Sequence, residues 1–239
     1  MVIALAFLAT AVSSLFAQAT LVRYTARHRP HQLAWTIALA MFALASAALA
    51  TGTSTGWDRG TFRFFYLFGA VLNVPWLALG TVFLLRGETA GRRAQWGLVF
   101  FSGLAAGVVF SAPMKAVGGL RIPVGKDVFD AFPRVLAAVG SGLGAVVIIV
   151  GAVLSAVRYA RDRRGAGSAR LAGANVLIAL GTLVLSSGGL VQGLVGHDEA
   201  FALTLAVGIS VVYGGFLVAE GVGARDGRAR AKDLAASRG

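Results

Sequence analysis

The feature that most constrains this chain is a series of apolar stretches of about 20 residues, separated by short segments that carry charges, glycine or proline. A helix of that length spans the ~30 Å hydrocarbon core of a bilayer. Only 13% of the residues are charged, against about 25% in a soluble domain, which excludes a water-soluble globule. We predict seven spans from hydropathy, at residues 2–22, 33–52, 62–85, 95–113, 135–158, 171–195 and 200–221.

The sequence therefore predicts an all-α, polytopic membrane bundle with a single folded unit. Residues 1–221 form the transmembrane domain, and residues 222–239 form a basic cytoplasmic tail that we expect to be disordered. The Ala17-Gln18-Ala19 sequence resembles a signal-peptide cleavage site, but residues 1–22 lack the basic region that a signal peptide needs. We interpret these residues as a retained first helix.

The basic residues indicate the orientation of the chain. With the N-terminus placed outside, six of the 22 Lys and Arg residues lie outside and the other 16 lie in cytoplasmic segments. The six are Arg59, Arg63, Lys115, Arg121, Lys126 and Arg134. This distribution obeys the positive-inside rule in each successive connection. It predicts a multi-pass protein of the inner (plasma) membrane, with its N-terminus outside and its C-terminus in the cytoplasm.

The net charge of +12 has a simple origin in this arrangement. Basic residues near the cytoplasmic surface attract the anionic lipids of the inner leaflet. The basic residues are also divided among short connections, whereas nucleic-acid binding needs one continuous basic surface. We therefore predict the lipid bilayer as a partner and no nucleic acid.

Three GxxxG pairs predict close helix packing, because small residues let helix backbones approach each other in lipid. The pairs are Gly103/Gly107, Gly140/Gly144 and Gly189/Gly193. They favour packing within one protomer, and the sharper alternative is a seam with a second copy or with another membrane protein.

Two local patterns concern the outer part of the chain. Pro75 removes a helix hydrogen bond in the third span, which predicts a kink near residues 69–71. In the 114–134 connection, apolar residues recur on one helical face, which predicts a short amphipathic helix at 125–132. That helix would either cap the bundle or float at the interface.

Several membrane chemistries lack their residues. The three histidines, His28, His31 and His197, lie at opposite ends of the predicted bundle, which argues against a haem or metal site, and cysteine is absent. No ionisable residue lies at the centre of a span, where proton pathways place theirs. We expect no catalytic residue, no cofactor and no metal site.

The remaining candidates are neutral polar groups, most of them in the outer half of the predicted membrane. They could line a pocket open to the outside, or they could bond to helix carbonyls and bridge helices. The candidate ligand residues are Asn73, Trp76, Ser111, Ser141, Ser186, Ser187 and Gln192, and the candidate rim residues are Arg63, Asp198 and Glu199.

The segments Arg63–Ala70 (RFFYLFGA) and Ile122–Gly125 (IPVG) resemble parts of uncharacterised seven-span integral membrane proteins of high-GC actinobacteria. The resemblance implies a source and a topology and carries no activity.

Two functional hypotheses follow. The first is a non-catalytic membrane protein that either binds a small apolar ligand in an outer-half pocket or serves as an accessory subunit of a membrane complex. The alternative is an uncoupled transporter, or facilitator, of a neutral solute.

Overall fold

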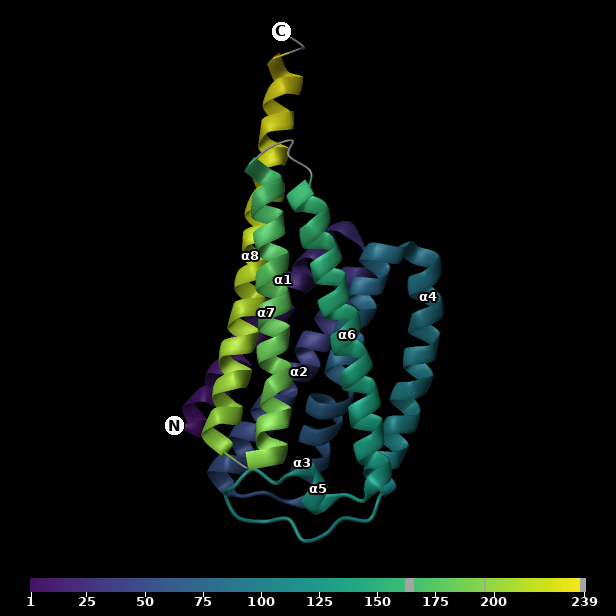
Figure 1. Cartoon of the computed structure of the whole chain (residues 1–239), viewed down its shortest axis with the longest axis vertical. Coiled ribbons are helices and arrows are strands. Elements are labelled where there is room, and N and C mark those ends of the chain that lie inside the picture. The colour runs from purple at the N-terminus through teal and green to yellow at the C-terminus, as the bar shows by residue number, and fades with distance from the viewer. Residues whose placement is uncertain (162–165, 196, 237–239) are drawn as a thin grey trace.

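The computed structural model is an elongated bundle of long helices that run side by side (Figure 1). It describes the backbone of residues 1–161, 166–195 and 197–236, and the side chains of these residues except 166–168, 190, 191, 193, 195 and 219–236. The elements are α1 (Val2–Arg27), α2 (Pro30–Thr55), α3 (Arg59–Phe65), the π-helix η1 (Tyr66–Leu72), α4 (Asn73–Ser111), α5 (Gly125–Val128), α6 (Ala131–Arg161), α7 (Ala166–Val195) and α8 (Asp198–Ala236).

The all-α prediction is confirmed over these residues. Six helical segments are long and apolar enough to cross a membrane. Five of them correspond to α1, α2, α6, α7 and α8, and the sixth is the continuous stretch Arg59–Ser111 of 53 residues. The tail predicted to be disordered covers residues 222–239. Of these, residues 222–236 continue α8 beyond the rest of the bundle (Figure 1), and residues 237–239 lie outside the described part of the chain.

The long Arg59–Ser111 stretch folds back on itself at Gly87. This residue has φ 81° and ψ −179°, a backbone conformation that only glycine adopts readily. It divides α4 into a proximal arm (73–86) and a distal arm (88–111), which lie side by side (Figure 1). The indole N–H of Trp76 donates to Ser102 Oγ across the two arms at 3.2 Å.

The helices form a closed ring in which each packs against its two neighbours. The order is α1, α2, η1 with the proximal arm of α4, α6, α7, α8, and back to α1. One apolar cluster, around Phe62, Leu49 and Phe129, fills the end of the ring near α3 and α5. A second, around Phe16 and Phe42, joins α1, α2 and α8.

The kink predicted near residues 69–71 falls within η1, where the chain takes π-helical hydrogen bonds. The predicted helix at 125–132 is wrong. The helix ends at Val128, Phe129 is extended and pairs with Met114 in an isolated β-bridge, and the next helix, α6, starts at Ala131. The reason is tertiary, because the Phe129 ring packs against Phe62 and Tyr66 at the end of the bundle, a contact that a continued helix would break.

Candidate functional site

The most constrained polar contact lies where Pro75 interrupts the third span. In η1 the N–H of Asn73 bonds to the carbonyl of Phe68, five residues earlier. Pro75 has no N–H, so at the junction of η1 and α4 a carbonyl about one turn earlier, at Ala70 or Val71, lacks its usual helix donor. The hydroxyl of Ser141 on α6 donates to the Ala70 carbonyl at 2.5 Å instead. Ser141 therefore supplies a donor from α6 to the turn of helix that Pro75 disturbs.

The glycines of α6 make that contact geometrically possible. A Cβ added to Gly140 would lie 3.0 Å from the carbonyl oxygen of Val71, and one added to Gly144 would lie 3.0 Å from the nitrogen of Pro75. Both are backbone atoms, so larger residues at these positions would push α6 away from η1. Close approach of the two backbones brings Ser141 within hydrogen-bonding distance of Ala70.

Two other candidates lie in the same helix as Pro75. Asn73 is 6% exposed, and its side-chain oxygen has no hydrogen-bond partner among the described residues. Trp76 is bonded to Ser102, which in turn donates to the carbonyl of Leu98 at 2.7 Å. Trp76 thus joins the arms of α4, and Asn73 is left as a buried amide with an unused acceptor.

A polar cluster joins the 112–130 connection to the corner between α7 and α8. The Asp198 carboxylate accepts from the Gln192 side-chain amide at 2.9 Å and from the backbone N–H of Ile122 at 3.1 Å. The same amide of Gln192 also donates to the Ile122 carbonyl at 3.4 Å. These bonds hold the connection over the end of the bundle. The predicted site residues Gln192 and Asp198 are therefore in contact, and their contact anchors the connection.

Arg63, a predicted rim residue, caps the end of α4. Its guanidinium donates to the carbonyls of Phe110 and Ala112, the latter at 2.7 Å, and its Nε lies 2.8 Å from the sulfur of Met114. The last carbonyls of a helix have no partner within the helix and carry partial negative charge. The charge of Arg63 is therefore directed at backbone groups and away from the proposed pocket.

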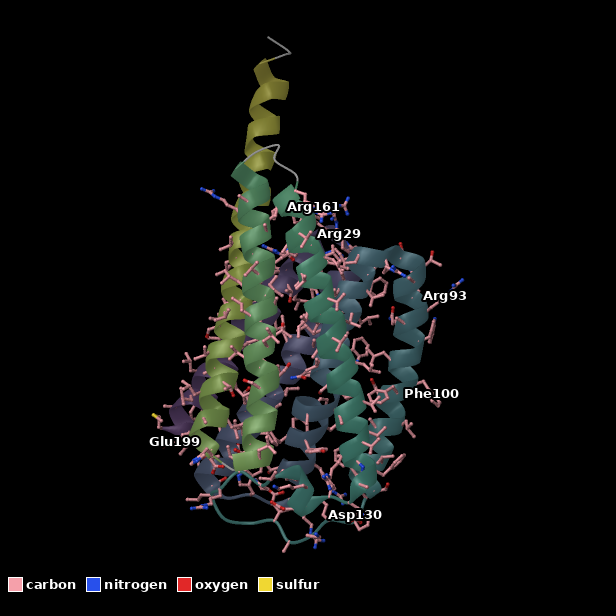
Figure 2. The ribbon with its side chains drawn as sticks, viewed as in Figure 1. Arg29, Arg93, Phe100, Asp130, Arg161 and Glu199 are labelled. Carbon is pink, nitrogen blue, oxygen red and sulfur yellow. The ribbon has the colours of Figure 1, made fainter. Side chains whose placement is uncertain are left out.

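The remaining candidates do not converge with these. The hydroxyl of Ser187 donates to the Val184 carbonyl of its own helix at 2.8 Å, and that of Ser111 lies 3.5 Å from the Val108 carbonyl. Ser111, Ser186 and Glu199 are exposed. Figure 2 shows Glu199 at the side of the bundle near α8, well away from Asp130.

The glycine pairs differ in what surrounds them. Gly140 and Gly144 are buried against η1 and α4, whereas Gly103, Gly107 and Gly189 are exposed, with no atom within 4 Å of an added Cβ. The surroundings of Gly193 lie outside the described residues.

Helices α7 and α8 pack closely through glycines that the GxxxG search missed. Gly181 and Gly188 on α7 meet Val212 and Thr204 on α8, and Gly208 and Gly215 on α8 meet Leu185 and Ala174 on α7. In each helix these glycines are seven residues apart, so a search at that period would have found them.

The structure also has an open apolar groove of about 390 Å³ between α1 and α8. Its lining contains none of the candidate ligand residues. It consists of Leu5, Leu8, Leu203, Ala206, Val207, Ser210 and Val211.

Ionisable groups show little sign of a reactive centre in the described part of the chain. Within it, no three His, Asp or Glu side chains are grouped so that they could hold a metal ion. Asp58 caps the start of α3, and hydrogen bonds from the side chain and then the backbone of Thr61 lower the pKa of its carboxyl.

No family model matches the sequence, and no curated protein or solved structure matches it.

Proposed function

We propose that this chain crosses the plasma membrane seven times, with its N-terminus outside and its C-terminus in the cytoplasm. The fold at Gly87 supports seven crossings, because the stretches before and after it, 59–86 and 88–111, are each at least about 35 Å long at 1.5 Å per residue. The charges support the orientation. Only six of the 22 Lys and Arg residues lie at the end that the positive-inside rule places outside, namely Arg59, Arg63, Lys115, Arg121, Lys126 and Arg134.

Within this topology we propose that the chain is a non-catalytic accessory subunit that joins a larger membrane complex through the distal arm of α4. The observation that carries the proposal is the outward face of that arm. Trp96, Phe100, Gly103 and Gly107 follow one another at helical spacing, and the two aromatic side chains are 75% and 76% exposed. Figure 2 shows Phe100 on the side of α4 away from the bundle.

Exposed apolar residues are ordinary on a membrane protein, but an exposed GxxxG pair is informative. Lipid gives helices no hydrophobic reason to associate, so contact depends on small residues that let backbones approach. Gly140 and Gly144 already have such partners in η1 and in the start of α4, as their contacts show. Gly103 and Gly107 have open space around them, which fits a helix of another subunit crossing at this point.

The test is to extract the protein from its own membrane under mild conditions and identify what remains bound by native mass spectrometry. We expect a stoichiometric protein partner on the unaltered chain and its loss in Gly103→Ile/Gly107→Ile. Gly142→Ile/Gly173→Ile is a matched control, since these helical glycines are also exposed with nothing within 4 Å. A bare monomer, a complex of this chain only with itself, or a partner retained by the seam variant would contradict the proposal.

The ligand-binding version of the hypothesis has weaker support. Ser141 and Ser187 donate their hydroxyl hydrogen bonds to backbone carbonyls, and the Gln192 amide donates to Asp198. The groove between α1 and α8 is apolar, and none of these three residues lines it. Their bonds are those of groups that hold helices and connections in place.

One observation favours the alternative of an uncoupled facilitator for a neutral solute. Asn73 offers a buried acceptor without a described partner, two residues before Pro75 in the third span. A water-filled path past this residue would let polar thiol reagents label cysteines introduced at Ala70, Asn73 and Leu77. Labelling from both faces, with solute flux in liposomes that contain only this protein, would favour the facilitator. Unlabelled cysteines would contradict it.

A further inference from the structure

Helix α1 carries the same heptad spacing on two opposite faces. One face packs against α2 and α8, and its buried residues are spaced alternately three and four apart. They are Ala6, Ala9, Ser13, Phe16 and Thr20. A second set with this spacing is exposed on the other side of the helix. It consists of Ala4, Phe7, Ala11, Ser14, Gln18 and Leu21. Such spacing is that of the contact residues in paired helices, and the exposed face has no partner within the described part of the chain.

Gln18 is the residue of the exposed face that most needs a partner. The stretch from Val2 to Val22 has no charged residue, and Arg23 follows it, so Gln18 lies about 7.5 Å inside the apolar span at 1.5 Å per residue. In a helix the Cα–Cβ bonds tilt towards the N-terminus. The Gln18 side chain therefore leans away from the Arg23 end and towards the middle of the span.

The amide of Gln18 has no hydrogen bond within the described part of the chain. By contrast, Ser13 and Thr20 on the buried face donate to carbonyls of their own helix, at 2.6 Å and 2.9 Å. An amide in hydrocarbon without a partner is costly, and glutamine side chains commonly bond across membrane helices. The exposed face of α1 thus presents a donor and an acceptor at a depth where lipid chains offer neither.

The chemistry of the amide favours a second copy of this chain as the partner. A glutamine side chain contains both an N–H donor and a carbonyl acceptor, so two of them satisfy each other. Copies of one chain insert in the same direction because the same charges orient them, and two α1 helices therefore meet in parallel. In a parallel heptad pair each contact residue lies opposite its own copy, which places the two Gln18 side chains together.

The rest of the exposed face suits close approach of two identical helices. Phe7 is 60% exposed, and the small residues Ala4 and Ala11 stand on either side of it along the face. Large residues beside small ones allow the side chains of two helices to interdigitate. Figure 1 shows the N-terminal end of α1 on the side of the bundle away from the distal arm of α4, so both surfaces can be occupied at once.

We propose that two copies of this chain associate through the exposed face of α1, with the side-chain amides of their Gln18 residues hydrogen-bonded to each other inside the membrane. The surface differs from the distal arm of α4, and either proposal can fail without the other. If both hold, the complex contains two copies of this chain, each with its own α4 partner.

Cysteine cross-linking tests the geometry of this contact. The chain has no cysteine, so a single introduced cysteine reports contact without background. Oxidation with iodine in the native membrane should link two copies of Ala4→Cys, Ala11→Cys or Ser14→Cys, because a disulfide needs Cα atoms within about 7 Å. The matched control is Leu143→Cys on α6, which is 65% exposed and as many residues from the start of its helix as Ser14. Equal cross-linking at Leu143→Cys and on α1 would indicate random collision and overturn the proposal.

Replacing Gln18 tests the amide itself. The association constant of the full chain in liposomes is measured by energy transfer between copies labelled with donor and acceptor dyes at Ser54→Cys, as added lipid dilutes the protein. Gln18→Leu should lower this constant about tenfold, the size of two membrane hydrogen bonds of average strength, whereas Gln18→Asn keeps the amide and should retain most of it. Asn175→Leu is the matched control, because that amide bonds to the Leu171 carbonyl of its own helix at 2.9 Å.

Three outcomes of the energy-transfer experiment would overturn the proposal. They are a chain that stays monomeric at every dilution, a dimer that Gln18→Leu does not weaken, and an equal loss in Asn175→Leu. Gly103→Ile/Gly107→Ile should leave the dimer intact while it removes the α4 partner, which separates a failure of this proposal from a failure of the proposed function.

Discussion

Replacing Ser141 with alanine tests whether its hydroxyl takes the place of the helix donor that Pro75 lacks. The hydroxyl lies 2.5 Å from the Ala70 carbonyl, and it reaches there from the next helix of the ring. Ser141→Ala removes the donor and leaves the carbonyl inside the bundle. The prediction concerns the free energy of unfolding and how it depends on residue 75.

The expected size follows from the environment of the carbonyl. An unsatisfied buried acceptor costs about 1–3 kcal/mol in proteins generally. Measured couplings within membranes average about 0.6 kcal/mol and reach about 1.7. We therefore expect Ser141→Ala to lower the free energy of unfolding by about 1 kcal/mol, within the range measured in membranes.

A double-mutant cycle with Pro75→Ala isolates the cause. Alanine restores an N–H at position 75, and this donor can take over the Ala70 carbonyl within the helix. In the Pro75→Ala background, Ser141→Ala should then lower the free energy of unfolding by only about 0.3 kcal/mol or less. The difference between its cost in the two backgrounds is the coupling energy that the cycle measures. The assay is reversible unfolding in mixed micelles with increasing denaturing detergent, followed by circular dichroism.

Ser187→Ala is the matched control, because that hydroxyl bonds only to the Val184 carbonyl of its own helix. We expect it to change stability by less than about 0.5 kcal/mol. An equal cost of Ser141→Ala with proline or with alanine at position 75 would refute the reasoning.

Three further predictions concern other contacts. Arg63→Met should lower the free energy of unfolding by about 2 kcal/mol, since it removes charged hydrogen bonds to the end of α4, whereas Arg59→Met, at an exposed position, should be near neutral in the same unfolding assay. Gly215→Ala should cost about 1–3 kcal/mol, because its Cβ would lie 2.8 Å from the Ala174 carbonyl oxygen, while Gly173→Ala has open space and should not destabilise; thermal melting compares the two. The lowered pKa of Asp58 means that its cap on α3 is present above about pH 4, the ordinary carboxyl value, and is lost as the pH falls through the folded-state pKa. Amide exchange at Gly60 and Thr61 should therefore accelerate in acid beyond the intrinsic trend, and Asp58→Ala should abolish the extra pH dependence; an unchanged profile would exclude the cap.

Much of the fold was predictable because its causes are local. Apolar stretches long enough to cross a bilayer must be helical, since lipid offers no partner for backbone groups. The proline at position 75 likewise predicts a disturbed helix near residue 70, because the missing N–H acts within one turn, and η1 lies there. The sequence also gives the polar residues of the candidate site. It does not give their hydrogen-bond partners, because those lie on other helices and connections.

Tertiary structure decided which face of each helix found a partner. The pairs Gly103/Gly107 and Gly140/Gly144 are alike in sequence, yet only the second contacts another backbone. Phe129 fits a helical pattern, and its contact with Phe62 made the backbone extended instead. Helical periodicity fixes the spacing of side chains around an axis, whereas the rotation of that axis depends on all neighbouring helices together, so the sequence by itself determined the spans and only the assembled ring determined their contacts.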